Sequence, residues 1–224
     1  MSPIITVHDL RYRYPDGNQA LDGVDFHLNE GECVAVFGAN GSGKTTFILH
    51  LMGLLKGEGS VEIHGQAGLV FQDPDEQLFM PTVLDDVAFG PLNQGLTPEA
   101  AHARARHVLD RVGMAHALGR APYHLSAGEK RRVAIAGVLA MEPDILILDE
   151  PTTFLDPPAQ RDLVTLLREL PQAKLLVTHD TGFAQALATR AVFFAHGKIA
   201  GVGPVQEIIR RFSWQVHEHS PQSV

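Results

Sequence analysis

A phosphate-binding loop is the strongest chemical signal in the sequence. The run Gly38–Thr46 reads Gly-Ala-Asn-Gly-Ser-Gly-Lys-Thr-Thr and fits the pattern G-x-x-x-x-G-K-[ST] without a gap. Its glycines let backbone N–H groups turn toward one point, and the helix that follows adds its positive dipole end, so the loop attracts a polyphosphate. Lys44 can reach the β- and γ-phosphates, and the Thr45 hydroxyl can ligate Mg²⁺.

Two acids at the end of a second apolar run could complete that chemistry. Residues 145–148 read Ile-Leu-Ile-Leu, and Asp149 and Glu150 follow directly. Ligands sit at the carboxyl ends of strands in parallel sheets. Asp149 can hold Mg²⁺ directly or through water, and Glu150 can polarise an attacking water. A solvated strand end gives the same pattern, so the two acids alone are weak evidence for a catalytic site. The phosphate loop upstream and the Pro151-Thr152 that follows make that interpretation stronger.

The loop and the acids need a framework that brings strand ends together. Short apolar runs separated by turn residues predict strands, and longer periodic runs predict helices. Their alternation indicates an α/β fold with a mainly parallel sheet covered by helices, preceded by antiparallel N-terminal strands. The predicted strands cover residues 4–10, 24–28, 32–37, 61–64, 68–72, 145–148, 174–178 and 191–195, and the predicted helices begin near residues 47, 97, 127, 158 and 184.

One domain with an inserted helical lobe accounts for the order of these elements. Residues 1–72 and 141–212 form the predicted core, residues 73–140 the lobe, and residues 213–224 a polar tail. His217 and His219 lie two apart in that tail. Two imidazoles on a flexible segment make a poor metal site, so we interpret them as part of a loosely ordered tail.

Composition excludes several classes of protein. The formal net charge of −8 disfavours general nucleic-acid binding, which normally shows a basic patch. Cys33 is the only cysteine and lies in an apolar strand, so nothing indicates a secreted protein. The N-terminus lacks a signal-peptide pattern, and the longest apolar run, residues 133–141, is too short to cross a membrane. If the protein acts in a membrane process, we therefore expect it to bind a membrane partner from the cytoplasmic side.

Taken together, the motifs resemble those of the ATPase subunits of ATP-binding-cassette transporters, and the resemblance covers nearly the whole chain. It implies a P-loop ATPase core with an inserted helical lobe, so that residues 1–224 form a single cassette. Beside the phosphate loop, six motifs stand in the family's order: an adenine-stacking aromatic at Tyr14, a lid glutamine at Gln72, a signature run at Leu125–Glu129, a second nucleotide motif at Leu148–Thr152, the loop after it at Phe154–Asp156, and a switch histidine at His179.

The resemblance also implies a role for each residue. Two cassettes would pair head to tail, with each ATP between the phosphate loop of one chain and the signature run of the other. Glu150 and His179 would be catalytic, and Thr45, Gln72 and Asp149 would hold Mg²⁺. ATP would contact Tyr14, Gly38, Asn40, Gly41, Ser42, Gly43, Lys44, Thr45, Thr46 and Gln72 of one protomer, and Ser126, Ala127, Gly128, Glu129 and Asp156 of its partner.

The signature run departs from the family's usual Leu-Ser-Gly-Gly-Gln at two positions. Ala127 replaces a glycine, which restricts φ and could slow closure, and Glu129 replaces a glutamine. Ser126 and the next two backbone N–H groups still open a helix and can offer donors to a γ-phosphate. The added negative charge would need an offset from Lys130, Arg131 or Arg132, a run that otherwise reads as a solvated helix start.

Three further segments resemble energy-coupling-factor ATPases, which power micronutrient importers with a separate substrate-capture subunit. They are residues 71–79, 81–91 and 132–137. The residues of these three segments most resemble those of the cobalt- and nickel-transporter ATPases, and the biotin-transporter ATPase is also similar. The implied partners are a second cassette, an integral membrane coupling subunit and a substrate-capture subunit. The sequence leaves the solute open, and also whether the cassette dimer is homomeric.

Other nucleotide-binding classes fit the sequence less well. A guanine-nucleotide switch would carry Asn-Lys-x-Asp, which is absent. A chromosome or repair ATPase would have a long coiled coil between Lys44 and Ser126, and a translation-associated protein would normally carry two cassettes. A regulatory cassette without hydrolysis would lack Glu150 or His179. A soluble cassette ATPase that is not tied to transport stays an alternative.

Overall fold

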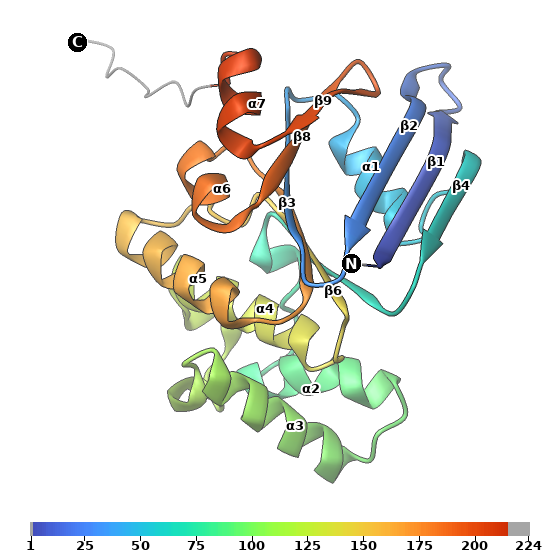
Figure 1. Cartoon of the computed structure of the whole chain (residues 1–224). Coiled ribbons are helices and arrows are strands. Elements are labelled where there is room, and N and C mark those ends of the chain that lie inside the picture. The colour runs from blue at the N-terminus through green and yellow to red at the C-terminus, as the bar shows by residue number, and fades with distance from the viewer. Residues whose placement is uncertain (1, 215–224) are drawn as a thin grey trace.

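The computed structural model describes residues 2–214, which form two sheets with helices around them (Figure 1). The larger sheet has the strand order β5-β6-β7-β3-β8-β9 and is parallel except for β9, which runs antiparallel to β8. The mainly parallel α/β fold predicted from the sequence is therefore confirmed. Its strands are β3 (Cys33–Gly38), β5 (Ala67–Val70), β6 (Ile145–Asp149), β7 (Ala173–Val177), β8 (Arg190–Ala195) and β9 (Lys198–Gly203).

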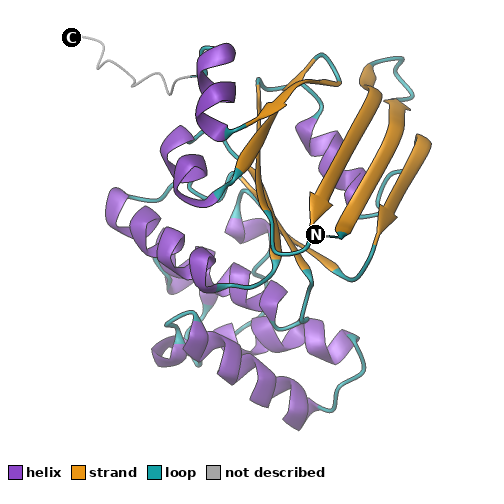
Figure 2. Cartoon of the chain, viewed as in Figure 1, coloured by secondary structure: helices purple, strands orange, loops and turns teal. Residues whose placement is uncertain are grey.

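A separate antiparallel sheet holds the N-terminal strands in the order β2-β1-β4 (Figure 2). It is built from β1 (Pro3–Arg13), β2 (Gln19–Asn29) and β4 (Glu58–Ile63). Alternate residues of β2 are buried, as expected for a sheet with one face on the core. Helix α1 (Lys44–Leu51) joins the two sheets in one apolar cluster, where the Phe47 ring lies 5.4 Å from that of Phe26 and 5.3 Å from that of Phe194.

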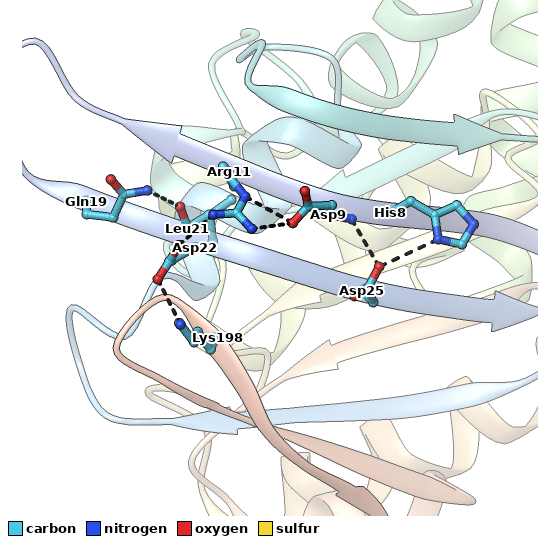
Figure 3. A network of polar contacts seen from close by, with 8 residues as sticks. All are labelled: His8, Asp9, Arg11, Gln19, Leu21, Asp22, Asp25 and Lys198. Atoms are coloured by element: carbon cyan, nitrogen blue, oxygen red, sulfur yellow. Dashed lines mark hydrogen bonds and ion pairs between the residues drawn. The ribbon is translucent and has the colours of Figure 1, made fainter.

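Polar contacts also tie the antiparallel sheet to the turn before β9 (Figure 3). Lys198 Nζ lies 2.9 Å from Asp22 Oδ2, and the Asp22 N–H donates to the Gly197 carbonyl at 2.9 Å. Arg11 bridges Asp22 and Asp9, and Asp9 sits in the left-handed region with a φ of 44° at a bulge of β1. Each exposed ion pair adds little energy, but together the contacts fix where the small sheet lies.

The segment after β5 forms the predicted helical lobe, drawn lowest in Figure 1. Its long helices are α2 (Val83–Asn93), α3 (Pro98–Arg111) and α4 (Ala127–Leu139), with 3-10 turns at Pro74–Glu76, Ala115–Ala117 and Pro122–His124. The Thr97 side chain caps α3 and Pro98 begins it, as the sequence predicts. Helix α4 packs against α2, α3 and β5, so it connects the lobe to the core.

The remaining helices cover the large sheet: α5 (Pro157–Glu169), α6 (Thr181–Leu187) and α7 (Val205–Arg211). Several predicted boundaries are wrong: β1 extends to Arg13 instead of residue 10, β2 begins at Gln19 instead of residue 24, β4 begins at Glu58 instead of residue 61, and β5 ends at Val70 instead of residue 72. The sequence analysis missed α2, α7 and β9 altogether. The tail histidines His217 and His219 lie outside the described residues. Within residues 2–214, no helix is both long enough and apolar enough to span a membrane. The division into core, lobe and tail at the predicted boundaries stays a prediction.

Candidate functional site

A pocket of about 880 Å³ opens where β3, β6 and β7 end. Many of the residues predicted to bind ATP, Mg²⁺ or water line it, although they come from five separate stretches of the chain. They are Tyr14, Asn40, Gly41, Gly43, Lys44, Thr45, Thr46, Gln72, Asp149, Glu150 and His179. The sequence analysis assigned no binding role to five further lining residues, Asn18, Ala20, Thr152, Thr153 and Asp180, although Thr152 belongs to its second nucleotide motif. Four of these directly follow or neighbour a predicted motif, so proximity in sequence could have identified them.

The phosphate loop needs its glycines for steric reasons. Gly43 has a φ of 110°, and a Cβ there would lie 2.6 Å from the Ala20 carbonyl oxygen. Gly38 has a φ of 146°, and its Cβ would lie 2.5 Å from the Phe194 carbonyl oxygen. Gly38 and Ser42 are buried residues of the loop and do not line the pocket. Their predicted contact with phosphate therefore stays a prediction.

Lys44 is a buried cation at the floor of this loop. Its Nζ donates to the Gly38 carbonyl at 2.6 Å and to the Ala39 carbonyl at 3.0 Å. Burial lowers the pKa of the ammonium, and the nearby Glu150 and Asp149 oppose that shift. The next residue, Thr45, is exposed toward the pocket. A desolvated ammonium and a free hydroxyl therefore face the same space.

The two acids at the end of β6 are both partly buried, and burial raises the pKa of each. The Glu150 side chain is 12% exposed, and burial is the main cause that raises its pKa to about 7. A carboxylate that gives up its proton near neutral pH suits a general base. Burial also raises the pKa of Asp149, against the opposing charges of Lys44 and Arg131. Glu150 has a φ of 42°, a left-handed conformation that is rare for its residue type.

His179 follows β7 and contacts Glu150 in two ways. The His179 N–H donates to Glu150 Oε2 at 3.1 Å, and the ring atom Nε2 lies 3.0 Å from Glu150 Oε1. Oε1 is buried and accepts no well-aligned hydrogen bond from residues 2–214. Burial, and then the charge of Lys44, lowers the pKa of His179, which favours the neutral ring. One face of the imidazole stacks on Trp214, a neighbour that the sequence analysis missed.

Tyr14 stands at the rim of the pocket in a tight turn. The Gly17 N–H donates to the Tyr14 carbonyl at 2.9 Å, and the Tyr14 hydroxyl lies 3.1 Å from Thr46 Oγ1. The Tyr14 ring meets that of Tyr12 edge to face, with centroids 5.0 Å apart. The ring is thus held beside the phosphate loop, where the sequence predicts that adenine stacks.

Gln72 lies on the pocket wall, and a buried arginine from α4 holds its backbone. Arg131 is 1% exposed and donates to the Phe71 carbonyl at 2.6 Å and to the Gln72 carbonyl at 2.7 Å. Burial lowers the pKa of Arg131 to about 10. The interpretation of Arg131 as part of a solvated helix start is therefore wrong. The sequence alone did not reveal that Arg131 is buried, because four consecutive charged residues are typical of an exposed helix face.

The signature residues open α4 but do not line the pocket of their own chain. Ser126 caps the helix, and Glu129 Oε2 accepts from the Ser126 N–H at 2.8 Å and from its hydroxyl at 2.9 Å, which makes a capping box. These hydrogen bonds, together with Arg120 and His116, lower the pKa of Glu129 to about 2. Ala127 and Gly128 occupy the first turn, and Asp156 caps α5 by accepting from the Ala159 N–H.

The expected offset of the Glu129 charge comes from different residues than predicted. Arg120 Nη1 lies 3.0 Å from Glu129 Oε1, and His116 Nε2 lies 3.4 Å from the same oxygen. The three basic residues after Glu129 are engaged elsewhere: Lys130 with Asp75 at 2.7 Å, Arg131 with the Phe71 and Gln72 carbonyls, and Arg132 with Asp162 at 2.9 Å. The correction follows from the fold of the lobe, which returns residues 116–120 to the start of α4.

The residues predicted to hold Mg²⁺ suit an ion that takes most of its ligands from water and from the nucleotide phosphates. Thr45, Gln72 and Asp149 all line the pocket and offer oxygen atoms. Within residues 2–214, no three His, Cys, Asp or Glu side chains gather as a metal cage. Mg²⁺ typically takes one or two protein ligands and completes its octahedron with water and phosphate oxygens, so this sparse set suits it when a nucleotide is bound.

Comparison with known families and relatives agrees with this geometry. Residues 21–153 match the family described as ABC transporter. An ABC transporter ATP-binding protein of Geobacter sulfurreducens is 49% identical to this chain, and the match covers 92% of this chain and 88% of the relative. The energy-coupling factor transporter ATP-binding protein EcfA of Methanosphaera stadtmanae is 42% identical over 93% of this chain and 82% of its own.

Solved structures share the fold. CbiO1 of Clostridium perfringens, part of the ABC transporter complex CbiONQ, superimposes with a TM-score of 0.84 and 34% identity, covering 96% of both chains. The cassette MJ0796, solved as a dimer in a post-hydrolysis state with ADP and phosphate, has a TM-score of 0.79 and 27% identity. It covers 90% of this chain and 98% of that cassette.

Proposed function

This chain belongs to the ABC transporter family as an ATP-binding subunit with ATPase activity, and from that premise we propose the system that it powers. We propose an importer of the energy-coupling-factor type that carries a transition-metal cation, with cobalt as the first candidate. Nickel and biotin are the alternatives within that type. The name EcfA of one relative and the CbiONQ complex of another support the type. The runs at residues 71–79, 81–91 and 132–137, which together most resemble the cobalt- and nickel-transporter ATPases, support the choice of cation.

The observation that carries the catalytic proposal is the contact between Glu150 and His179 beside Lys44. Glu150 would accept the proton of the attacking water, because its pKa of about 7 leaves it poised near neutral pH. His179 would leave Glu150 Oε1, 3.0 Å away, and donate from Nε2 to the γ-phosphate. Lys44 would exchange its two carbonyl acceptors for phosphate oxygens.

Thr45, Asp149 and Gln72 would hold Mg²⁺ against the phosphates. The bound ion neutralises charge that develops on the transferred phosphoryl group. Asp149 supplies a half-buried carboxylate, Thr45 a hydroxyl, and Gln72 an amide oxygen from the neighbouring segment. Because Arg131 of α4 fixes the Gln72 backbone, a shift of the lobe would move this ligand relative to the other two.

A second protomer would close the site from the other side. Phosphoryl transfer needs charge compensation around the γ-phosphate, yet the signature residues do not reach the pocket of their own chain. A head-to-tail dimer would bring the partner's helix start and its donors to that phosphate. The residues proposed to contact ATP from the partner protomer are Ser126, Ala127, Gly128, Glu129 and Asp156.

We further propose that the lobe docks on a membrane subunit, which would place the chain peripherally on the cytoplasmic face of the cell membrane. Phe79 and Phe89 are 64% and 37% exposed, and their rings meet edge to face 5.1 Å apart. Glu76 provides negative charge nearby in the chain, and next to it stands Asp75, which is paired with Lys130 at 2.7 Å. An apolar pair with an acidic border suits a short amphipathic helix that carries arginine.

A Glu150→Gln variant tests the catalytic proposal. It should keep ATP binding, lower hydrolysis by about 10²–10⁴, and accumulate as an ATP-bound dimer, because it lacks the base but keeps the shape of the site. Glu169→Gln, an exposed acid at the end of α5, is the matched control and should hydrolyse ATP at the normal rate. A normal rate in Glu150→Gln would refute the role of Glu150.

The transport proposal is tested with the membrane partners. A tagged chain purified from its own membranes should carry an integral coupling subunit and a substrate-capture subunit. Vesicles that contain this complex should take up ⁵⁷Co²⁺ only when ATP is supplied. Uptake of nickel or biotin instead would select the alternative solute, and purification without any membrane protein would favour the soluble cassette ATPase.

A further inference from the structure

Trp214 connects the C-terminal end of the described chain to the catalytic site. It follows α7, its N–H donates to the Ile209 carbonyl at 2.9 Å, and it is the only tryptophan in the sequence. Its ring lies 5.3 Å from that of Phe193 and 6.5 Å from that of Phe37, on the strands that flank the phosphate loop. The indole is therefore held by packing on the large sheet.

The face of the indole is directed at the catalytic histidine. The His179 and Trp214 rings are stacked, with centroids 5.4 Å apart and planes 29° from parallel. Glu150 contacts the edge of the same imidazole, at Nε2. His179 is 43% exposed, so among the aromatic contacts within residues 2–214 this stack alone restrains its ring plane.

We propose that Trp214 is a positioning residue that fixes the plane of the His179 imidazole. The ring can then turn Nε2 from Glu150 toward the γ-phosphate without leaving the productive orientation. A partly exposed imidazole has two soft torsions, and a fixed aromatic surface on one face removes most of that freedom before the reaction. The inference rests on the proposed role of His179 and adds the end of α7 to the ATP site.

Substitution of Trp214 gives the first test. Trp214→Ala should lower kcat for ATP hydrolysis about 3- to 10-fold, the factor that corresponds to an aromatic pair, and leave the Kd for ATP unchanged. Trp214→Phe and Trp214→Tyr should restore most of the rate, because they keep a ring against His179. Phe212→Leu is the matched control, since Phe212 stacks on Phe193 at 4.0 Å and does not contact His179. Thermal unfolding of each variant shows whether the fold is kept.

A double-mutant cycle separates this inference from the proposed function. His179→Ala should itself reduce hydrolysis, and adding Trp214→Ala should reduce it no further, because the two rings act as one unit. A normal rate in His179→Ala would contradict the proposed function. A slow His179→Ala together with a normal Trp214→Ala, or a full additional loss in the double variant, would contradict the positioning role alone.

The single tryptophan also gives a spectroscopic signature that a merely structural role would lack. In the Glu150→Gln variant, saturating ATP should change the emission of Trp214, since Nε2 of the stacked imidazole turns from residue 150 toward the phosphate and the polarity beside the indole changes. The change should be absent in Glu150→Gln/His179→Ala, while ATP still binds. If the emission of Trp214 in Glu150→Gln does not change when the site is saturated with ATP, the inference is wrong. This test does not need Trp214→Ala, so it remains decisive if that variant fails to fold.

Discussion

Tyr14 offers a prediction at the scale of a single residue. Replacement by Ala removes the ring at the pocket rim and should weaken ATP binding by about 1–3 kcal/mol, the range for base stacking on an aromatic side chain. Tyr14→Phe keeps the ring and loses only the contact with Thr46 Oγ1, so it should cost about 1 kcal/mol or less. Calorimetry on the Glu150→Gln background measures both values. Equal affinity in the alanine variant would place adenine elsewhere.

Among single residues, the sequence predicted those that belong to short local motifs. Lys44, Glu150 and His179 each follow an apolar strand, and parallel strands deliver their ends to one edge. Trp214 was missed because its contact with His179 depends on α7, which carries no strong signal of its own. The partners of Glu129 were missed for the same reason, since Arg120 reaches it through the turn before α4.

Arg131 carries the prediction at the scale of elements, because it joins α4 to the segment after β5. Arg131→Met removes two donors and leaves the Phe71 and Gln72 carbonyls without their partners, which should lower the free energy of unfolding by about 2–4 kcal/mol. Lys130→Met on the same helix breaks only a surface pair with Asp75 and should cost about 1 kcal/mol at most. Urea unfolding compares the two, and equal costs would contradict the anchoring role.

Elements with clear periodicity and caps were predictable, and those without them were not. Buried strands such as β3 and β6 are continuous apolar runs, and α3 has a capping threonine and a first-turn proline. By contrast, β9 contains two glycines and follows the turn at Gly197, so its run carries little strand propensity. Helix α2 includes Gly90 and Pro91, which weaken its helical signal, although packing against α3 and α4 supports it.

Charge on the lobe gives a prediction at the scale of the whole molecule. Changing Asp75 and Glu76 together to Lys should reduce solute uptake at least about tenfold, because like charges would face the arginine expected on the membrane subunit. ATP binding by the isolated chain should be unchanged, since neither residue lines the pocket. Changing two exposed acids on α3, Glu99 and Asp110, to Lys alters the net charge by the same amount and serves as the control. Undiminished uptake in vesicles would exclude this docking face.

The separation of the signature residues from their own pocket has a genetic consequence. Lys44→Ala and Ser126→Arg should each inactivate a pure preparation, one by spoiling the phosphate loop and the other by spoiling the helix start. In the proposed head-to-tail dimer of two copies of this chain, mixing and exchange of the two inactive chains would make about half of the dimers hybrids, and each hybrid would hold one site built from two undamaged halves. Two null alleles supplied together should therefore restore ATP hydrolysis that neither supports alone, and a mixture as inactive as its parts would contradict the proposed dimer.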